Sequence, residues 1–291
     1  MRFLLAGILI FAPLCGFAEG EGAFDPGRPE EQDSAVVPDA EPPVDEECDV
    51  ETGGPVGPPP DRTPDLFRAV AGDEMATVGQ LLDSGVDVNA ILPLPAPDDL
   101  LVRFRDTYLE YFFTKENGLT PLMLSSAMGY PDVVKLLLER GAKRNALTKK
   151  HRTFALWLAG RSGHVEVMQL LLGVAPESDA ARTKIHISLA EQTAWLWRNG
   201  KIERTMPVST GRKKFPTPKG RFVVTDKYKD WKSTIYPARM PYFLRLSCKD
   251  FGMHAGALPG YPASHGCIRL PAADAKALFA EVPVGTLVEI D

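Results

Sequence analysis

A segment in the first half of the chain recurs 34 residues later, and this repeat restricts the fold more than any other feature. The first copy opens with Thr-Pro-Leu at residues 120–122 and contains three leucines at 136–138. The second copy contains Gly163, His164 and three leucines at 170–172. A unit of this length typically forms a helix pair whose apolar face is buried only when neighbouring units stack. The repeat therefore predicts a helical stack.

A weaker copy lies upstream, because Leu81, Leu82, Gly85 and Asn89 stand 56 residues before the corresponding residues of the first copy. The excess over one period places an insert near residues 92–117. We expect this insert to be an extra helix that caps the stack, with a binding loop as the alternative. The period, the Thr-Pro-Leu opening and the Gly-His pair resemble the ankyrin repeat. The resemblance implies about three repeats over residues 65–177 that bind a protein partner, which the sequence leaves unnamed.

The formal net charge of −5 is the sum of two unlike halves. Residues 1–177 contain 15 Lys and Arg against 28 Asp and Glu, whereas residues 178–291 contain 18 against 10. Much of the acidity lies in residues 19–64, which hold 14 acidic residues, two basic residues and ten prolines. Such a segment cannot bury enough apolar surface to fold, so we expect a disordered linker. A solvated spacer is the preferred interpretation, and a contact with the basic half is the alternative.

The first residues are typical of an export signal. Arg2 precedes the apolar residues 3–17, and Ala18 completes a small-residue cleavage site, so residues 1–18 are predicted to be a signal peptide. Lipid attachment at Cys15 is the disfavoured alternative, because the preceding Leu14 is bulky. No later apolar run reaches the ~20 residues that a membrane helix needs. We therefore expect an exported protein of the periplasm or cell envelope, without a membrane span.

From Lys184 the hydrophobic period changes to two, which is typical of β-strands. Ile185, Ile187 and Leu189 alternate with polar residues, and Asn199-Gly200 between two such runs predicts a hairpin. Further strands are expected at residues 205–209, 221–225, 242–246 and 286–290, with one helix between Pro271 and Pro283. The fold class is therefore multidomain α and β, with an N-terminal α-helical stack and a mostly antiparallel β domain over residues 178–291 that has one late helix.

One cysteine has neighbours that favour reactivity. Signal removal leaves three cysteines, at positions 48, 248 and 267, and an odd number in an oxidising compartment leaves at least one thiol. Cys267 follows Gly266, while His254 and His265 are near it in sequence and can favour the attacking thiolate. N–H groups around Gly266 and Cys267 can face a developing oxyanion. Arg269 can hold a substrate carboxylate. This set is coherent for acyl transfer through a thioester.

Residues 264–270, Ser-His-Gly-Cys-Ile-Arg-Leu, resemble the signature of the L,D-transpeptidase catalytic domain, often called the YkuD domain. Two upstream pieces match the same family in order. These are Val-Ser-Thr-Gly at 208–211 with Thr-Pro-Lys-Gly-Arg-Phe at 217–222, and His-Ala-Gly at 254–256. The resemblance covers residues 183–291. It implies an enzyme that cuts the amide between the third-position diamino acid and D-Ala of bacterial peptidoglycan stem peptides.

The resemblance also implies a role for each matching residue. Cys267 would be the nucleophile and His254 the general base, and Arg269 would organise the site or bind the substrate. The remaining matched residues would support the oxyanion and the nucleophile: Ser264, His265, Gly266 and Gly256. No metal or organic cofactor is implied. The acyl acceptor stays open among a second stem peptide (a 3→3 cross-link), a lipoprotein lysine, a free D-amino acid, and water, which would make an L,D-carboxypeptidase. The loop between His254 and Ser264 is shorter than in many members, which adds to this question.

Three other interpretations are weaker. The chain could be a non-catalytic ankyrin scaffold that binds the cell wall. Zinc could be held by His254, His265, Cys267 and Cys248, although their spacing matches no common zinc module. The basic residues 212–214, with Lys219 and Arg221, could contact nucleic acid. An exported enzyme that meets an anionic wall explains this charge better, so we expect no nucleic-acid partner.

Overall fold

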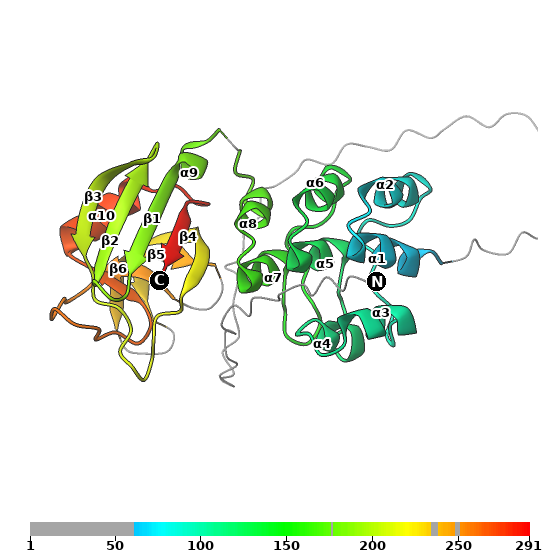
Figure 1. The fold of residues 1–291 in the computed structure, drawn as a ribbon, viewed down its shortest axis with the longest axis horizontal. Helices are drawn as coiled ribbons and strands as arrows, with labels where there is room; N and C mark the ends of the chain where they lie inside the picture. Colours follow the sequence, from blue (N-terminus) through cyan, green and yellow to red (C-terminus); the bar gives the residue numbers. More distant parts are fainter. Residues whose placement is uncertain (1–60, 176, 234–237, 248–250) are drawn as a thin grey trace, which may run out of the picture. The chain divides into compact units, whose positions relative to one another are not determined.

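The computed structural model describes residues 61–175, 177–233, 238–247 and 251–291 (Figure 1). The predicted signal peptide, nearly all of the predicted linker, and the cysteines at 15, 48 and 248 lie outside these residues. The linker prediction is wrong for residues 63 and 64, because helix α1 begins at Thr63. Pro64 lies in the first turn of this helix, where its missing N–H costs no hydrogen bond. Among the described helices, none is both long and apolar enough to cross a bilayer.

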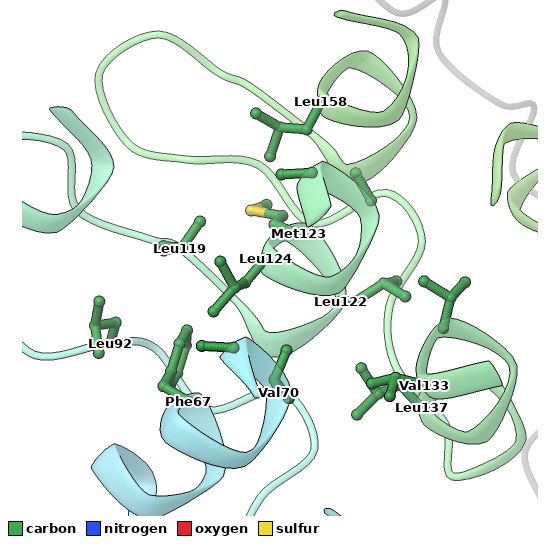
Figure 2. Close-up of a cluster of buried hydrophobic side chains, with 14 of the residues drawn as sticks. Phe67, Val70, Leu92, Leu119, Leu122, Met123, Leu124, Val133, Leu137 and Leu158 are labelled. Carbon is green, nitrogen blue, oxygen red and sulfur yellow. The ribbon is translucent and has the colours of Figure 1, made fainter. Parts of the chain in front are cut away.

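The N-terminal part contains three helix pairs, which confirms the predicted helical stack. The pairs are α1 (Thr63–Ala71) with α2 (Met75–Asp83), α5 (Pro121–Met128) with α6 (Pro131–Glu139), and α7 (Ala155–Ser162) with α8 (Val165–Leu171). Helix α5 contacts both α1 and α7, and α6 contacts both α2 and α8. Figure 2 shows the resulting core, in which Phe67 of α1, Leu124 of α5 and Leu137 of α6 are fully buried. Each helix pair thus buries the apolar face of its neighbour.

Local sequence explains where the repeat helices begin and end. Thr120 accepts a hydrogen bond from the Met123 N–H at 3.3 Å, which caps the N-terminus of α5. Gly129 ends α5 with φ of +78°, a conformation that favours glycine. A side chain at this glycine would also collide with the imidazole of His164 in the next repeat. The Gly-His pattern of the repeat therefore marks a close approach between neighbouring units.

The insert forms two short helices, α3 (Asp98–Phe104) and α4 (Glu110–Thr114). The expectation of a single helix that caps the stack is wrong. The insert contacts all three repeats, through Asp99 to Arg68 of α1, through the buried Glu116 to His151, and through Tyr108 to Ser162 of α7. It therefore lies along the side of the stack. The physical reason is its aromatic content, since Phe104 and other apolar residues of the insert join the core of the repeats.

The C-terminal part is an eight-stranded sheet in the order β3-β2-β1-β8-β4-β5-β6-β7. The strands are β1 (Thr183–Ser188), β2 (Thr193–Arg198), β3 (Lys201–Pro207), β4 (Gly220–Lys232), β5 (Arg239–Leu246), β6 (Gly252–Ala255), β7 (Ile268–Leu270) and β8 (Leu287–Ile290). Five of the seven pairings are antiparallel, and β1·β8 and β6·β7 are parallel. Asn199 and Gly200 both have positive φ, which confirms the predicted hairpin.

Helix α10 (Ala272–Glu281) is the predicted late helix, and it packs against β5 and β6. Its buried Ala275 and Leu278 share a core with Met253 of β6 and Ile268 of β7. A four-residue helix, α9 (Asp179–Arg182), precedes β1 and was not expected. The helix and the sheet core together hold β6 and β7 side by side. These two strands carry the His-Ala-Gly and Gly-Cys-Ile-Arg pieces of the sequence.

Candidate active site

The parallel pairing of β6 with β7 brings the histidine and cysteine motifs together. His254 is paired with Arg269 in the register of these strands. Cys267 directly precedes β7, two positions before Arg269. Side chains two positions apart on an extended chain share one face. The register therefore places Cys267, His254 and Arg269 on the same face of the sheet, opposite to the buried Ile268.

His254 is buried, with 7% of its surface exposed. Its Nδ1 lies 2.8 Å from the carbonyl oxygen of Ala255, which can only accept, so Nδ1 carries the proton and donates. Nε2 of the neutral ring is then an acceptor. Burial, with a smaller effect from the positive charge of Arg269, lowers the pKa of His254 below its usual value, against the opposing effect of the Ala255 carbonyl. The ring is therefore suited to take a proton at neutral pH.

Hydrogen bonds hold the loop before the half-buried Cys267 thiol in one shape. Ser264 Oγ donates to the carbonyl of Cys267 at 2.5 Å and accepts from the N–H of Gly266 at 3.1 Å. Gly266 has φ of +119°, in the region that favours glycine. Thr217 Oγ1 donates to the Gly266 carbonyl and accepts from the Gly211 N–H, both at 2.8 Å. Thr217 is buried, so these two bonds connect the Thr-Pro piece directly to the nucleophile loop.

The surroundings of Cys267 are positively charged. The positive charge of Arg269 acts on both His254 and His265. The pKa of His265 is lowered mainly by desolvation, and the positive charges of Arg212 and Arg269 add smaller effects in the same direction. Its neutral Nε2 accepts a hydrogen bond from Arg212 at 2.5 Å. Nearby positive charge favours a thiolate over a thiol. The described residues include no group of three or more His, Cys, Asp or Glu that could hold a metal ion.

Comparison with known proteins matches both halves of the chain. Residues 182–290 match the YkuD L,D-transpeptidase catalytic domain, and residues 66–183 match three copies of the ankyrin repeat. The putative L,D-transpeptidase YkuD of Bacillus licheniformis is 30% identical over 115 residues, which are 38% of this chain and 67% of that protein. The chain belongs to the YkuD family. It carries an ankyrin-repeat region before its YkuD domain.

Two further similarities are partial. An L,D-transpeptidase of known structure from Mycobacterium tuberculosis H37Rv is 27% identical, with a TM-score of 0.36. The match covers 38% of this chain and 57% of that one, so the chain spans less than two thirds of that structure. A Drosophila melanogaster transient receptor potential channel, subfamily A member 1, is 41% identical over 76 residues, which are 25% of this chain and 6% of the channel.

Two backbone amides of the YkuD domain near Cys267 and His254 are paired within the protein. The N–H of Gly266 donates to Ser264 Oγ, and the N–H of Gly256 donates to the Leu270 carbonyl at 3.0 Å. The Gly266 amide is therefore already paired within the loop, and the oxyanion role expected around Gly266 and Cys267 stays a prediction. Gly256 instead leaves space for Arg269. A Cβ atom at position 256 would lie only 2.9 Å from the aliphatic part of the Arg269 side chain. Gly266 supplies the unusual backbone angle before Cys267.

Sequence reasoning missed several residues that support the YkuD site. Thr217 lies within one of the sequence motifs, but nothing in the sequence indicates that its hydroxyl forms hydrogen bonds with both Gly211 and Gly266. Gln192 was missed entirely, although its side chain donates to Thr210 Oγ1 at 2.7 Å and accepts from the Thr210 N–H at 2.9 Å. A lone polar residue in a turn carries no signal of such a contact. Arg212 belongs to a basic run in the sequence, which does not indicate that it directly contacts His265.

Proposed function

We propose that the protein is a peptidoglycan L,D-transpeptidase with Cys267 as nucleophile and His254 as general base. The proposed substrate is a stem peptide cut between its third-position diamino acid and D-Ala. In this proposal residues 178–291 are the catalytic domain of an exported enzyme of the bacterial cell envelope. The ankyrin repeats, over residues 65–177, bind a protein partner. Ankyrin surfaces commonly bind proteins, and the YkuD family match supports the substrate class.

The first half-reaction forms a thioester. His254 Nε2 takes the proton of the Cys267 thiol, and the sulfur attacks the amide carbonyl carbon. The C–N bond then breaks, and D-Ala leaves as an amine that takes the proton back from His254. Ser264, Gly266 and Thr217 make hydrogen bonds that hold the nucleophile loop in one shape, which supports this step. Splitting the transfer into two steps lowers the barrier of each.

The second half-reaction transfers the acyl group to an amine. His254 takes a proton from the acceptor amine as its nitrogen attacks the thioester carbonyl. The C–S bond breaks, and the Cys267 thiolate is protonated again by His254. A second stem peptide as acceptor gives a 3→3 cross-link, whereas a lipoprotein lysine gives tethering and a free D-amino acid gives exchange. Water as acceptor gives a carboxypeptidase.

One observation carries this proposal. The hydrogen bond from His254 Nδ1 to the Ala255 carbonyl leaves Nε2 as an acceptor. The β6·β7 register places this ring on the face of Cys267. A base needs the right protonation state and the right place, and this hydrogen bond and register support the assignment of that role to His254. A scaffold that only binds the wall requires neither.

The test is mass spectrometry of the purified full-length protein after incubation with disaccharide-tetrapeptide, beside the Cys267→Ala variant. Dimers that lack one D-Ala, formed only by the unsubstituted protein, would support transpeptidation. Tripeptide alone would indicate a carboxypeptidase, and D-amino acid added to the mixture tests exchange. Unchanged substrate with both proteins, together with equal binding of tetrapeptide by both, would favour the scaffold alternative.

A further inference from the structure

The arginines of the catalytic half are not all neutralised. Residues 178–291 contain eight arginines, all within the described residues. Six of them form ion pairs with a carboxylate: Arg182, Arg198, Arg204, Arg221, Arg239 and Arg245. In the described part of the chain, Arg212 and Arg269 have no such partner. These are also the two arginines whose charge acts on His265, two positions before Cys267.

Arg212 is held in place without being neutralised. Its guanidinium donates to Nε2 of His265, a ring that is neutral when it accepts this bond. The same group lies 4.9 Å from the ring centre of Phe215, which in turn lies 4.9 Å from His265. The Arg212 backbone N–H donates to the Ser264 carbonyl at 3.0 Å. A cation fixed by a neutral ring and an aromatic face keeps its full charge for a ligand.

Lys214 extends the same cationic surface, since its ammonium lies 5.7 Å from the centre of the Phe215 ring. Lys213 and Lys219 are exposed nearby in sequence. A fixed guanidinium matches the two oxygens of a carboxylate, and its preorganisation lowers the entropy cost of binding. A carboxamide in the same place would accept only through its one oxygen and carries no charge.

We propose that Arg212, held by His265 and Phe215 and assisted by Lys214, binds a second substrate carboxylate, separate from any that Arg269 binds. The ligand class is an acidic peptide that carries a free carboxylate close to the amide that Cys267 attacks. The protein therefore distinguishes stem peptides with a free carboxylate from stems in which the same group is a carboxamide. This inference rests on the proposed function for the identity of the peptide, while the carboxylate site itself is independent of turnover.

The test is calorimetry on full-length Cys267→Ala protein with two synthetic tetrapeptide stems that differ only by carboxylate or carboxamide at the residue before the diamino acid. We expect the carboxylate stem to bind at least about tenfold more tightly than the carboxamide stem. This is the difference expected from a hydrogen bond to a charged group. Adding Arg212→Gln should bring the two affinities close together, mainly by weakening the carboxylate stem. Adding Arg204→Gln is the matched control, because Arg204 of β3 is an arginine of the same domain whose charge is already paired, with Glu281 at the end of α10. It should leave the preference unchanged.

Equal affinity for the two stems, no binding of either stem, or an equal loss for both stems with Arg212→Gln would overturn the carboxylate site. Failure of the proposed function has a different signature. In that case the protein with Cys267 intact turns over neither stem, while the Cys267→Ala protein still prefers the carboxylate stem and loses this preference with Arg212→Gln. Circular dichroism of each variant shows whether a lost preference reflects unfolding.

Discussion

At the scale of single residues, the protonation of His254 affects stability and, in the proposed mechanism, the chemistry. Because burial and Arg269 lower its pKa below 6.5, we expect kcat/KM to be constant near neutral pH and to fall only as pH drops below 6.5. Unfolding frees the ring to protonate at its ordinary pKa. The neutral folded ring therefore contributes stability above pH 6.5, which is lost as pH falls through the lower folded value. NMR titration of the His254 ring in Cys267→Ala protein measures this pKa directly, and a midpoint above 6.5 would contradict the argument.

Gly266 gives a second prediction at this scale. Its φ of +119° is costly for any residue with a side chain, although the nearest atom to an added Cβ is 4.0 Å away. We expect Gly266→Ala to lose about 1–3 kcal/mol of unfolding free energy through backbone strain and to lose turnover. Gly200→Ala is the control, since it also has positive φ and open space but lies in the β2–β3 hairpin. Denaturant unfolding should show similar destabilisation of the two variants. Turnover assays should show that only Gly266→Ala loses activity.

At the scale of elements, Thr217 connects the segment before β4 to the nucleophile loop. The carbonyl and the following N–H of a trans peptide point in opposite directions. The bond from Thr217 to the Gly266 carbonyl therefore also sets the direction of the Cys267 N–H. We expect Thr217→Val to cost about 1–3 kcal/mol, because the buried Gly266 carbonyl and the part-buried Gly211 N–H lose their partner, and to lower kcat more than it changes KM. Thr217→Ser keeps the hydroxyl and should retain activity, and kcat unchanged by Thr217→Val would contradict this role.

The lateral insert depends on a buried carboxylate. Glu116 accepts hydrogen bonds from the backbone N–H groups of Lys150 and His151 and from the His151 ring. Burial raises the pKa of Glu116, but the hydrogen bonds together lower it by more. The net pKa therefore lies below the usual 4.5. The ionised group thus contributes stability above pH 4.5 that is lost as pH falls through the folded value. We expect Glu116→Gln to reduce the stability at pH 7 and to flatten its acid dependence, measured by urea unfolding at several pH values.

At the scale of the whole molecule, charge is unevenly distributed along the chain. The 18 basic and 10 acidic residues within 178–291 give this half a positive charge that attracts anions at long range, and salt screens this attraction. If the substrate is an acidic stem peptide, kcat/KM should fall several-fold as sodium chloride rises from ~0.05 to ~0.5 M, while kcat stays constant. A stem peptide with all its carboxylates amidated is the control and should show little dependence. An equal salt effect on both would indicate that salt acts on the protein instead.

Much of the element plan is local and therefore visible in the sequence. The triple-leucine helices, the glycines that end them, the period-two strands and the Asn199-Gly200 hairpin each depend on neighbours within a few residues. The predicted ankyrin stack and mostly antiparallel β domain followed from these patterns. The insert was the exception. It forms two short helices, and only the three-dimensional core shows that their apolar residues pack along the repeats.

The sequence by itself determined the family, the fold class and a motif that contains Cys267 and His254, because these depend on residue types in a fixed order. Only the tertiary structure decided how these residues meet. The parallel register of β6 and β7 aligns His254 with Arg269, and Thr217 reaches Gly266 across 49 positions of the chain. The tertiary structure also shows that Arg212 forms a hydrogen bond with His265 and that no carboxylate neutralises its charge among the described residues. Hydrogen bonds and charge pairing between distant segments arise from packing, which no local pattern encodes.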